Sequence, residues 1–288
     1  MQSIRRQGRR GLGLGLLVLC AAAWAPAQAN GPLDFYYERS LMAAAGARCN
    51  LFNAQIRAAL EAASAQARSA ALRAGRSEPD VQAVRSRAAA KAEAVSCGSP
   101  DLATAAVRVR TAFEGWSKVT RITYPGADGG WTADRTVYRS PTWRLVESSG
   151  PEAAFGVAGN EAAPYALAAV MAANGGEAPY GARLKFRDLQ RAPAAWLARS
   201  GADALPPPAA LRTVFAEAKA PAAPGLSHGD GSATAFRFPS AAADALAALD
   251  PRERFEVEFL YAHDHVRTAT FEVGDFAAGR AFLAMGAR

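Results

Sequence analysis

The sequence has few of the residues that build catalytic and metal sites, with three histidines and three cysteines among 288 residues. It has no Ser-x-x-Lys pair in a setting that indicates a nucleophile, and a Ser-His-Asp set would have to assemble from distant segments. Glu256 and Glu258 alternate with apolar residues, so we expect both on the solvated face of a strand. We therefore assign no catalytic residue and expect no cofactor.

Long hydrophobic runs are also lacking. The longest apolar stretch, residues 12–23, is interrupted only by glycine and is shorter than the ~20 residues that span a bilayer. Four arginines precede it, and the small residues of Ala27-Gln28-Ala29 follow it. This order is typical of a secretory signal peptide, residues 1–29, cleaved near Ala29. We expect a periplasmic or secreted protein whose mature chain has no transmembrane segment.

Two other export routes fit residues 1–29 less well. Cys20 ends the apolar stretch, where a lipoprotein is acylated, but Leu19 before it is larger than such processing favours. Arg5-Arg6 resembles the start of a twin-arginine signal, but Gln7-Gly8 follows in place of apolar residues. The general secretory route fits the segment better than either.

The mature chain has little net charge. The formal charge of +7 falls to about +3 once the four signal arginines are removed. Nucleic-acid binding needs a concentrated basic face, so we expect no nucleic-acid partner. The expected partner is an unidentified envelope component, which is a protein, a peptide or a glycan.

Only Cys49 and Cys97 remain after signal cleavage. Two thiols in an oxidising compartment predict a disulfide, the alternative being two buried free thiols. No histidine stands near them, so the spacing does not favour a zinc site.

Helices are predicted for most of residues 34–117. Asn53 is a suitable N-cap for one helix, and Ser77 with Asp80 forms a capping-box pattern for the next. Their apolar stripes are rich in alanine, so neighbouring helices can approach closely. We expect these two helices to form an antiparallel hairpin that brings Cys49 near Cys97. Ser99-Pro100-Asp101 begins a further helix.

Strands are predicted from residue 118 onward. Thr120, Ile122 and Tyr124 alternate with polar residues, and the glycine-rich segment 125–130 predicts a turn. Residues 118–147 are typical of an antiparallel meander. Near the C-terminus, residues 255–259 and 267–273 predict two strands, between a helix at 239–249 and a last helix at 276–285.

The last 140 residues also allow a tandem repeat, because similar apolar segments recur about 80 residues apart. Each copy would be strand, helix, strand and closing helix, with helices at residues 166–170 and 195–198 matching those at 245–249 and 281–284. Abundant alanine gives chance similarity as the alternative. A proline-rich connector, residues 204–208, would join the copies.

Residues 234–288 resemble the end of the invasion-associated locus B family of periplasmic proteins. The resemblance rests on Glu256-Val257-Glu258-Phe259, on Ala269-Thr270-Phe271-Glu272-Val273 and on Gly274-Asp275-Phe276-Ala277-Ala278. It implies a β-rich extracytoplasmic module without enzyme activity. The cysteines that such proteins often carry here are absent, and the resemblance assigns no functional residue.

All three histidines lie in predicted loops. His263-Asp264-His265 has ligand-type residues two apart, and His228 lies in a glycine-rich turn. If the two loops met, His228, His263 and His265 would form a metal site. The alternative is a polar hairpin tip without a ligand.

Aromatic and arginine residues gather between residues 116 and 144. Together they predict either a groove for a glycan or peptide, or the core between a helix and the meander. The candidate groove residues are Trp131, Arg135, Tyr138, Trp143 and Arg144.

The sequence predicts an α+β protein with a signal peptide (1–29), a disulfide-linked helical hairpin module (30–117), a β-meander module (118–203) and a C-terminal α+β module (204–288). We expect a non-catalytic binding or envelope-interaction protein. The alternative is a hydrolase, metal-dependent or not, that uses His228, His263 and His265.

Overall fold

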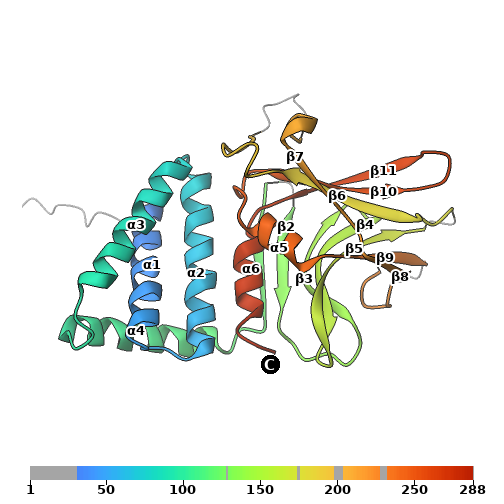
Figure 1. Ribbon diagram of the computed structural model, residues 1–288. Helices are drawn as coiled ribbons and strands as arrows, with labels where there is room; N and C mark the ends of the chain where they lie inside the picture. Colours follow the sequence, from blue (N-terminus) through green and yellow to red (C-terminus); the bar gives the residue numbers. More distant parts are fainter. Residues whose placement is uncertain (1–30, 128, 174–175, 198–203, 228–231, 288) are drawn as a thin grey trace, which may run out of the picture.

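The structure, a computed structural model, describes residues 31–127, 129–173, 176–197, 204–227 and 232–287. The predicted signal peptide and His228 lie outside the described residues. A helical module stands beside a β-sandwich (Figure 1). The predicted α+β class, with helices first and antiparallel sheets after them, is confirmed. None of the helices in the described ranges is both long enough and apolar enough to cross a bilayer.

The helical module contains four helices: α1 (Pro32–Arg48), α2 (Ala54–Arg73), α3 (Glu78–Ala94) and α4 (Pro100–Trp116). The predicted caps are present. Asn53 accepts a hydrogen bond from the backbone N–H of Ile56 at 2.9 Å, and Ser77 with Asp80 forms a capping box. After α2, Gly75 has φ of +86°, a left-handed conformation in which glycine is not strained.

The helix neighbours differ from the predicted hairpin. Helix α1 lies between α2 and α3 and packs against both, whereas α2 and α3 touch little (Figure 1). Buried alanines on all three helices, Ala45, Ala71 and Ala88, allow this close approach. Sequence spacing could not identify α1 as the central helix, because each of the three has an alanine-rich face.

The Cys49–Cys97 disulfide is confirmed, with a Cα–Cα distance of 5.5 Å. Cys49 is the C-cap of α1, and Cys97 follows the end of α3. The bond therefore joins the C-terminal ends of two packed helices. Arg48 donates a hydrogen bond to the carbonyl of Val95 beside it.

Eleven described strands form two antiparallel sheets. The larger sheet has the order β1 (Arg121–Pro125), β2 (Gly130–Asp134), β3 (Thr142–Ser149), β4 (Ala153–Asn160), β5 (Ala163–Ala172), β9 (Ala233–Phe238) and β8 (Ala218–Pro221). The smaller has the order β11 (Val266–Glu272), β10 (Arg254–Leu260), β6 (Gly181–Arg187) and β7 (Leu211–Phe215), with a short 3-10 helix, η1 (Pro208–Ala210), before β7. The predicted meander is β1–β2–β3.

Aromatic residues from both sheets fill the space between them. Phe155 of the larger sheet lies 4.8 Å from Phe255 and 5.7 Å from Phe271 of the smaller, measured between ring centroids. Phe236 and Phe259 form a similar pair at 5.9 Å. All five rings are at most 2% exposed, so this layer is the main core.

The boundary predicted near residue 203 does not separate two modules. Strand β9 pairs with β5 in the larger sheet, and β10 pairs with β6 in the smaller. Both sheets therefore combine strands from the 118–203 and 204–288 segments into one sandwich.

The expected tandem repeat is contradicted by β5. Residues 166–170, predicted as a helix, lie in this strand, paired with β4 on one side and β9 on the other. The expected closing helix at 195–198 is also absent over its described residues, 195–197. The matching segments near the C-terminus do form α5 (Ser240–Ala247) and α6 (Phe276–Leu283).

The prediction that Glu258 lies on a solvated face is wrong. It is only 8% exposed and is held between Arg183 and Lys185, with Lys185 Nζ 2.8 Å from its Oε1. Burial alone would raise its pKa, but hydrogen bonds from Lys185 and Arg183 and their positive charges hold the pKa below its ordinary value. The opposite side of the strand is as predicted, since Phe255, Val257 and Phe259 are buried.

Removal of the disulfide tests the stability of the helical module. The bond closes a loop with a sequence separation of 48 residues, and the chain-entropy model values it at about 4 kcal/mol. A Cys49→Ser/Cys97→Ser protein should lose roughly this much free energy of unfolding in urea titrations followed by circular dichroism.

A reductant should destabilise the native protein and leave the double variant unchanged. Equal stability of the oxidised native protein and the variant would contradict the prediction.

Candidate functional site

The predicted aromatic and arginine groove is mainly part of the protein core. Trp131 is 1% exposed, packs on Phe276 with 4.9 Å between ring centroids, and donates a hydrogen bond to the carbonyl of Glu272 at 3.2 Å. Trp143 donates to the carbonyl of Leu226 at 3.1 Å on the other side of the sheet. The two indoles therefore do not line one groove.

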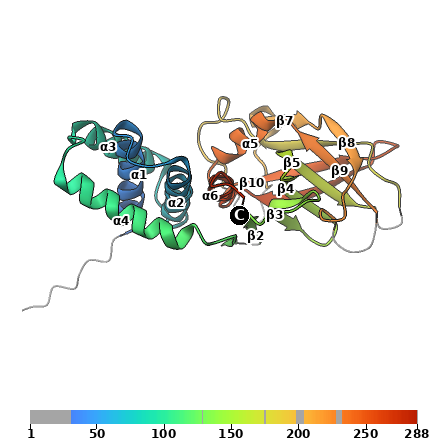
Figure 2. The ribbon, with the colours of Figure 1, turned by 90° about the horizontal axis from the view of Figure 1, so that it is seen from below.

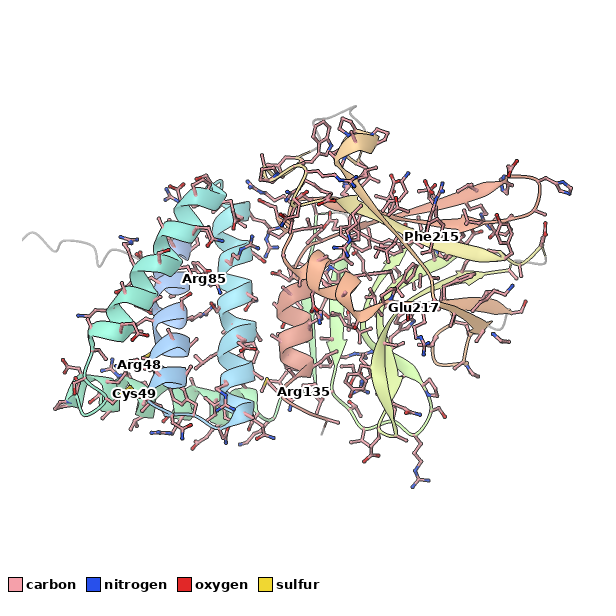
Figure 3. The ribbon with its side chains drawn as sticks, in the orientation of Figure 1. Arg48, Cys49, Arg85, Arg135, Phe215 and Glu217 are labelled. Atoms are coloured by element: carbon pink, nitrogen blue, oxygen red, sulfur yellow. A yellow bond between two sulfur atoms is a disulfide. The ribbon has the colours of Figure 1, made fainter. Side chains whose placement is uncertain are left out.

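The two arginines of this cluster are buried as well. Arg135 (labelled in Figure 3) donates to the carbonyl of Gly286 at 2.7 Å and lies over the ring of Phe282. Arg144 is 1% exposed and lies between the rings of Tyr138 and Tyr165, each 5.3 Å from its guanidinium carbon. Such contacts stabilise a buried cation, so this cluster has a structural role.

His263 and His265, the two histidines that the structure describes, do not lie in a cluster of metal-ligating side chains within the described ranges. His263 and Asp264, at the tip of the β10–β11 hairpin, have φ of +55° and +57°. Asp and His tolerate this left-handed conformation better than most residues, which accounts for their presence in the turn. The ring of His265 packs near Tyr261. His228 lies outside the described residues, and no group of three metal-ligating side chains is present in the described ranges.

One sequence signal was overlooked. Gly225-Leu226-Ser227-His228-Gly229 has the Gly-x-Ser-x-Gly spacing of a hydrolase nucleophile elbow. In that elbow the serine sits between a strand and a helix, whereas this segment lies between strands β8 and β9. The Ser227 hydroxyl donates to the carbonyl of Pro224 at 3.3 Å. The structural context therefore does not support a nucleophile here.

A cleft lined by both charged and apolar residues lies where the helical module meets the sandwich. It has a volume of about 260 Å³ and is formed by α2 and α3 on one side, and by the end of α5 and the start of α6 on the other. Helix α6 packs directly against α2, and Figure 2 shows it between the two modules. The cleft therefore exists only because the two modules are held together.

The two arginines of this cleft differ in whether they have a partner. Arg68 is fixed by Glu78, 2.8 Å away, and donates to the carbonyl of Leu249 across the cleft at 3.3 Å. Gln82 also donates to Glu78, at 2.9 Å. Arg85 (labelled in Figure 3) lines the cleft from α3 and makes no ion pair with any described residue. The cleft can therefore offer one uncommitted guanidinium to a ligand.

A second unusual group is Glu147 on β3, where this strand of the larger sheet meets the end of β11. It is 4% exposed, and both of its oxygens lie 3.2 to 3.3 Å from the backbone N–H of Glu272, which donates to them. The β1–β2 turn covers it so closely that a Cβ at Gly129 would lie 3.0 Å from its Oε1. Burial raises the pKa of Glu147 to about 8, and the nearby Glu272 carboxylate adds to the rise. The hydrogen bond from the Glu272 backbone lowers the pKa but does not cancel these effects.

Comparison with models of protein families, with curated proteins and with solved structures found no match to this chain. The resemblance of residues 234–288 to the invasion-associated locus B family stays a prediction.

Glu147 should make stability depend on pH. Its pKa is about 8 in the folded chain, against an ordinary value of 4.5, so folding takes up a proton between these pH values. Its contribution is therefore most favourable below pH 4.5 and declines until about pH 8. Glu147→Gln should remove this decline. Between pH 4.5 and about 8, the free energy of unfolding of the variant should therefore rise relative to that of the native protein by up to roughly 1.4 kcal/mol per pH unit.

The measurement is urea unfolding at pH 5, 7 and 9. Glu161→Gln, a change at an exposed glutamate, is the matched control and should follow the native curve. If Glu147→Gln also ran parallel to the native protein across this range, the raised pKa would be wrong.

Proposed function

We propose that the mature protein is an exported, non-catalytic binding protein that holds a small anionic ligand in the cleft between its two modules. The observation that carries the proposal is this cleft, lined by Arg68 and by the uncommitted Arg85. Ligand sites form preferentially at the interfaces between structural units, in hollows with a few convergent polar groups.

The ligand class follows from the charges. Arg68 and Arg85 bring two positive charges, and only Glu78 among the lining residues brings a negative one. A carboxylate or phosphate would pair with Arg85 without displacing the Arg68–Glu78 ion pair. An anionic fragment of an envelope glycan or peptide has this chemistry.

Export is supported by the sequence of residues 1–29 and by the Cys49–Cys97 bond. The protein purified from the periplasmic fraction or the culture medium should begin at Asn30. N-terminal sequencing checks this, and a cytoplasmic protein that keeps Met1 would contradict it.

The cleft is tested by calorimetric titration with phosphate, succinate and glucuronate. At least one of these anions should bind, and Arg85→Ala should weaken its binding about tenfold or more, because a charge-assisted hydrogen bond is lost. Arg87→Ala is the matched control, since Arg87 lies two residues further along α3 and does not line the cleft.

Absence of binding by all three anions, or equal affinities of the two variants, would refute the anion site.

A further inference from the structure

A second hollow lies on the helical module and differs in chemistry from the cleft. It is a groove of about 230 Å³ between α2 and α4, lined by apolar side chains that include Ile56, Leu60, Phe113 and Trp116. Arg39, which reaches it from α1, is its only charged lining residue among those the structure describes. The groove thus combines an apolar floor with a single cation.

Arg39 is held in place but not neutralised. Its Nη1 donates to the carbonyl of Ala63 at 2.8 Å, and its guanidinium lies over the ring of Phe35 at 5.7 Å. It makes no ion pair with the described residues. Burial lowers the pKa of Arg39, against the influence of Glu38, which reflects the cost of partly removing a cation from water. An anion at this position would offset that cost.

We propose that the groove binds an aliphatic monoanion, such as a medium-chain fatty acid, with its carboxylate at Arg39 and its chain extending along α2 toward α4. The apolar floor provides the surface that an alkyl chain buries, and the guanidinium provides the complementary charge. From Ile56 to Ala63, α2 rises about 10 Å, which sets the scale of the chain that fits.

Other occupants fit less well. A polar metabolite would leave its hydrogen-bonding groups unpaired against Ile56, Leu60 and Phe113. A second copy of the protein needs roughly 800 Å² of contact on each partner, whereas this groove is one narrow hollow between two helices. The proposal does not depend on the anion cleft, because the two hollows share helix α2 but no lining residue.

The contributions of the ligand's charge and chain length can be tested with the mature protein. Decanoate and decanol share one chain and differ in charge, and both can be titrated by calorimetry below their aggregation limits. Decanoate should bind at least tenfold more tightly than decanol. Octanoate should bind more weakly than decanoate, by roughly fourfold per missing methylene.

Brominated decanoate should quench part of the tryptophan fluorescence. Trp116→Phe should abolish this quenching, and the matched Trp143→Phe, on the sandwich, should leave it unchanged.

Substitution of Arg39 tests the head group. Arg39→Gln should weaken decanoate at least tenfold and change decanol less than threefold, whereas Arg39→Lys should retain the preference for decanoate. Arg57→Gln is the matched control, because Arg57 also donates to a backbone carbonyl, that of Phe52, and does not line the groove.

Equal affinities of decanoate and decanol for the native protein would overturn the proposal, even if Arg39→Gln failed to fold. It would also be overturned by quenching that persists in Trp116→Phe, or by self-association that competes with decanoate in sedimentation.

Discussion

The packing of α2 against α6 is the contact on which the rest of the structure depends. It joins the helical module to the sandwich. At one end of this contact an ion pair links Arg73, the last residue of α2, to Asp275, the N-cap of α6, with 2.7 Å between Arg73 Nη2 and Asp275 Oδ2. Asp275 is 2% exposed, and its Oδ1 has no hydrogen-bond partner in the described part of the chain. A buried carboxylate without its arginine would be costly, so this pair constrains how the modules meet.

The helices could be predicted from the sequence because their signals are local. Asn53, Ser77 and Gly75 act within one turn of the helix ends that they define. The strand at residues 166–170 could not be predicted in this way, because its alanines favour a helix. These residues form a strand only because they pair with β4 and β9. Glu258 was mispredicted for a related reason, because Arg183 and Lys185 come from another strand.

The candidate sites were hidden from the sequence by the same non-local character. Arg85 and Arg39 occupy ordinary polar positions on α3 and α1, and the residues that complete the hollow beside each of them come from other helices. Residue type alone also could not distinguish a groove from a core. Trp131 and Arg144 are of residue types that are common in glycan-binding sites, yet both are buried.

The treatment of arginine differs between the core and the groove. Arg187, 3% exposed, meets both oxygens of Glu253 at 2.6 Å, so its charge is neutralised within the sandwich. Arg39 is also removed from water in part, but it receives only a carbonyl and a ring face. An exposed arginine needs no carboxylate, because water solvates it. A partly buried arginine beside Ile56 and Leu60 has lost part of that solvation, and a carboxylate bound from outside would provide for it what Glu253 provides for Arg187.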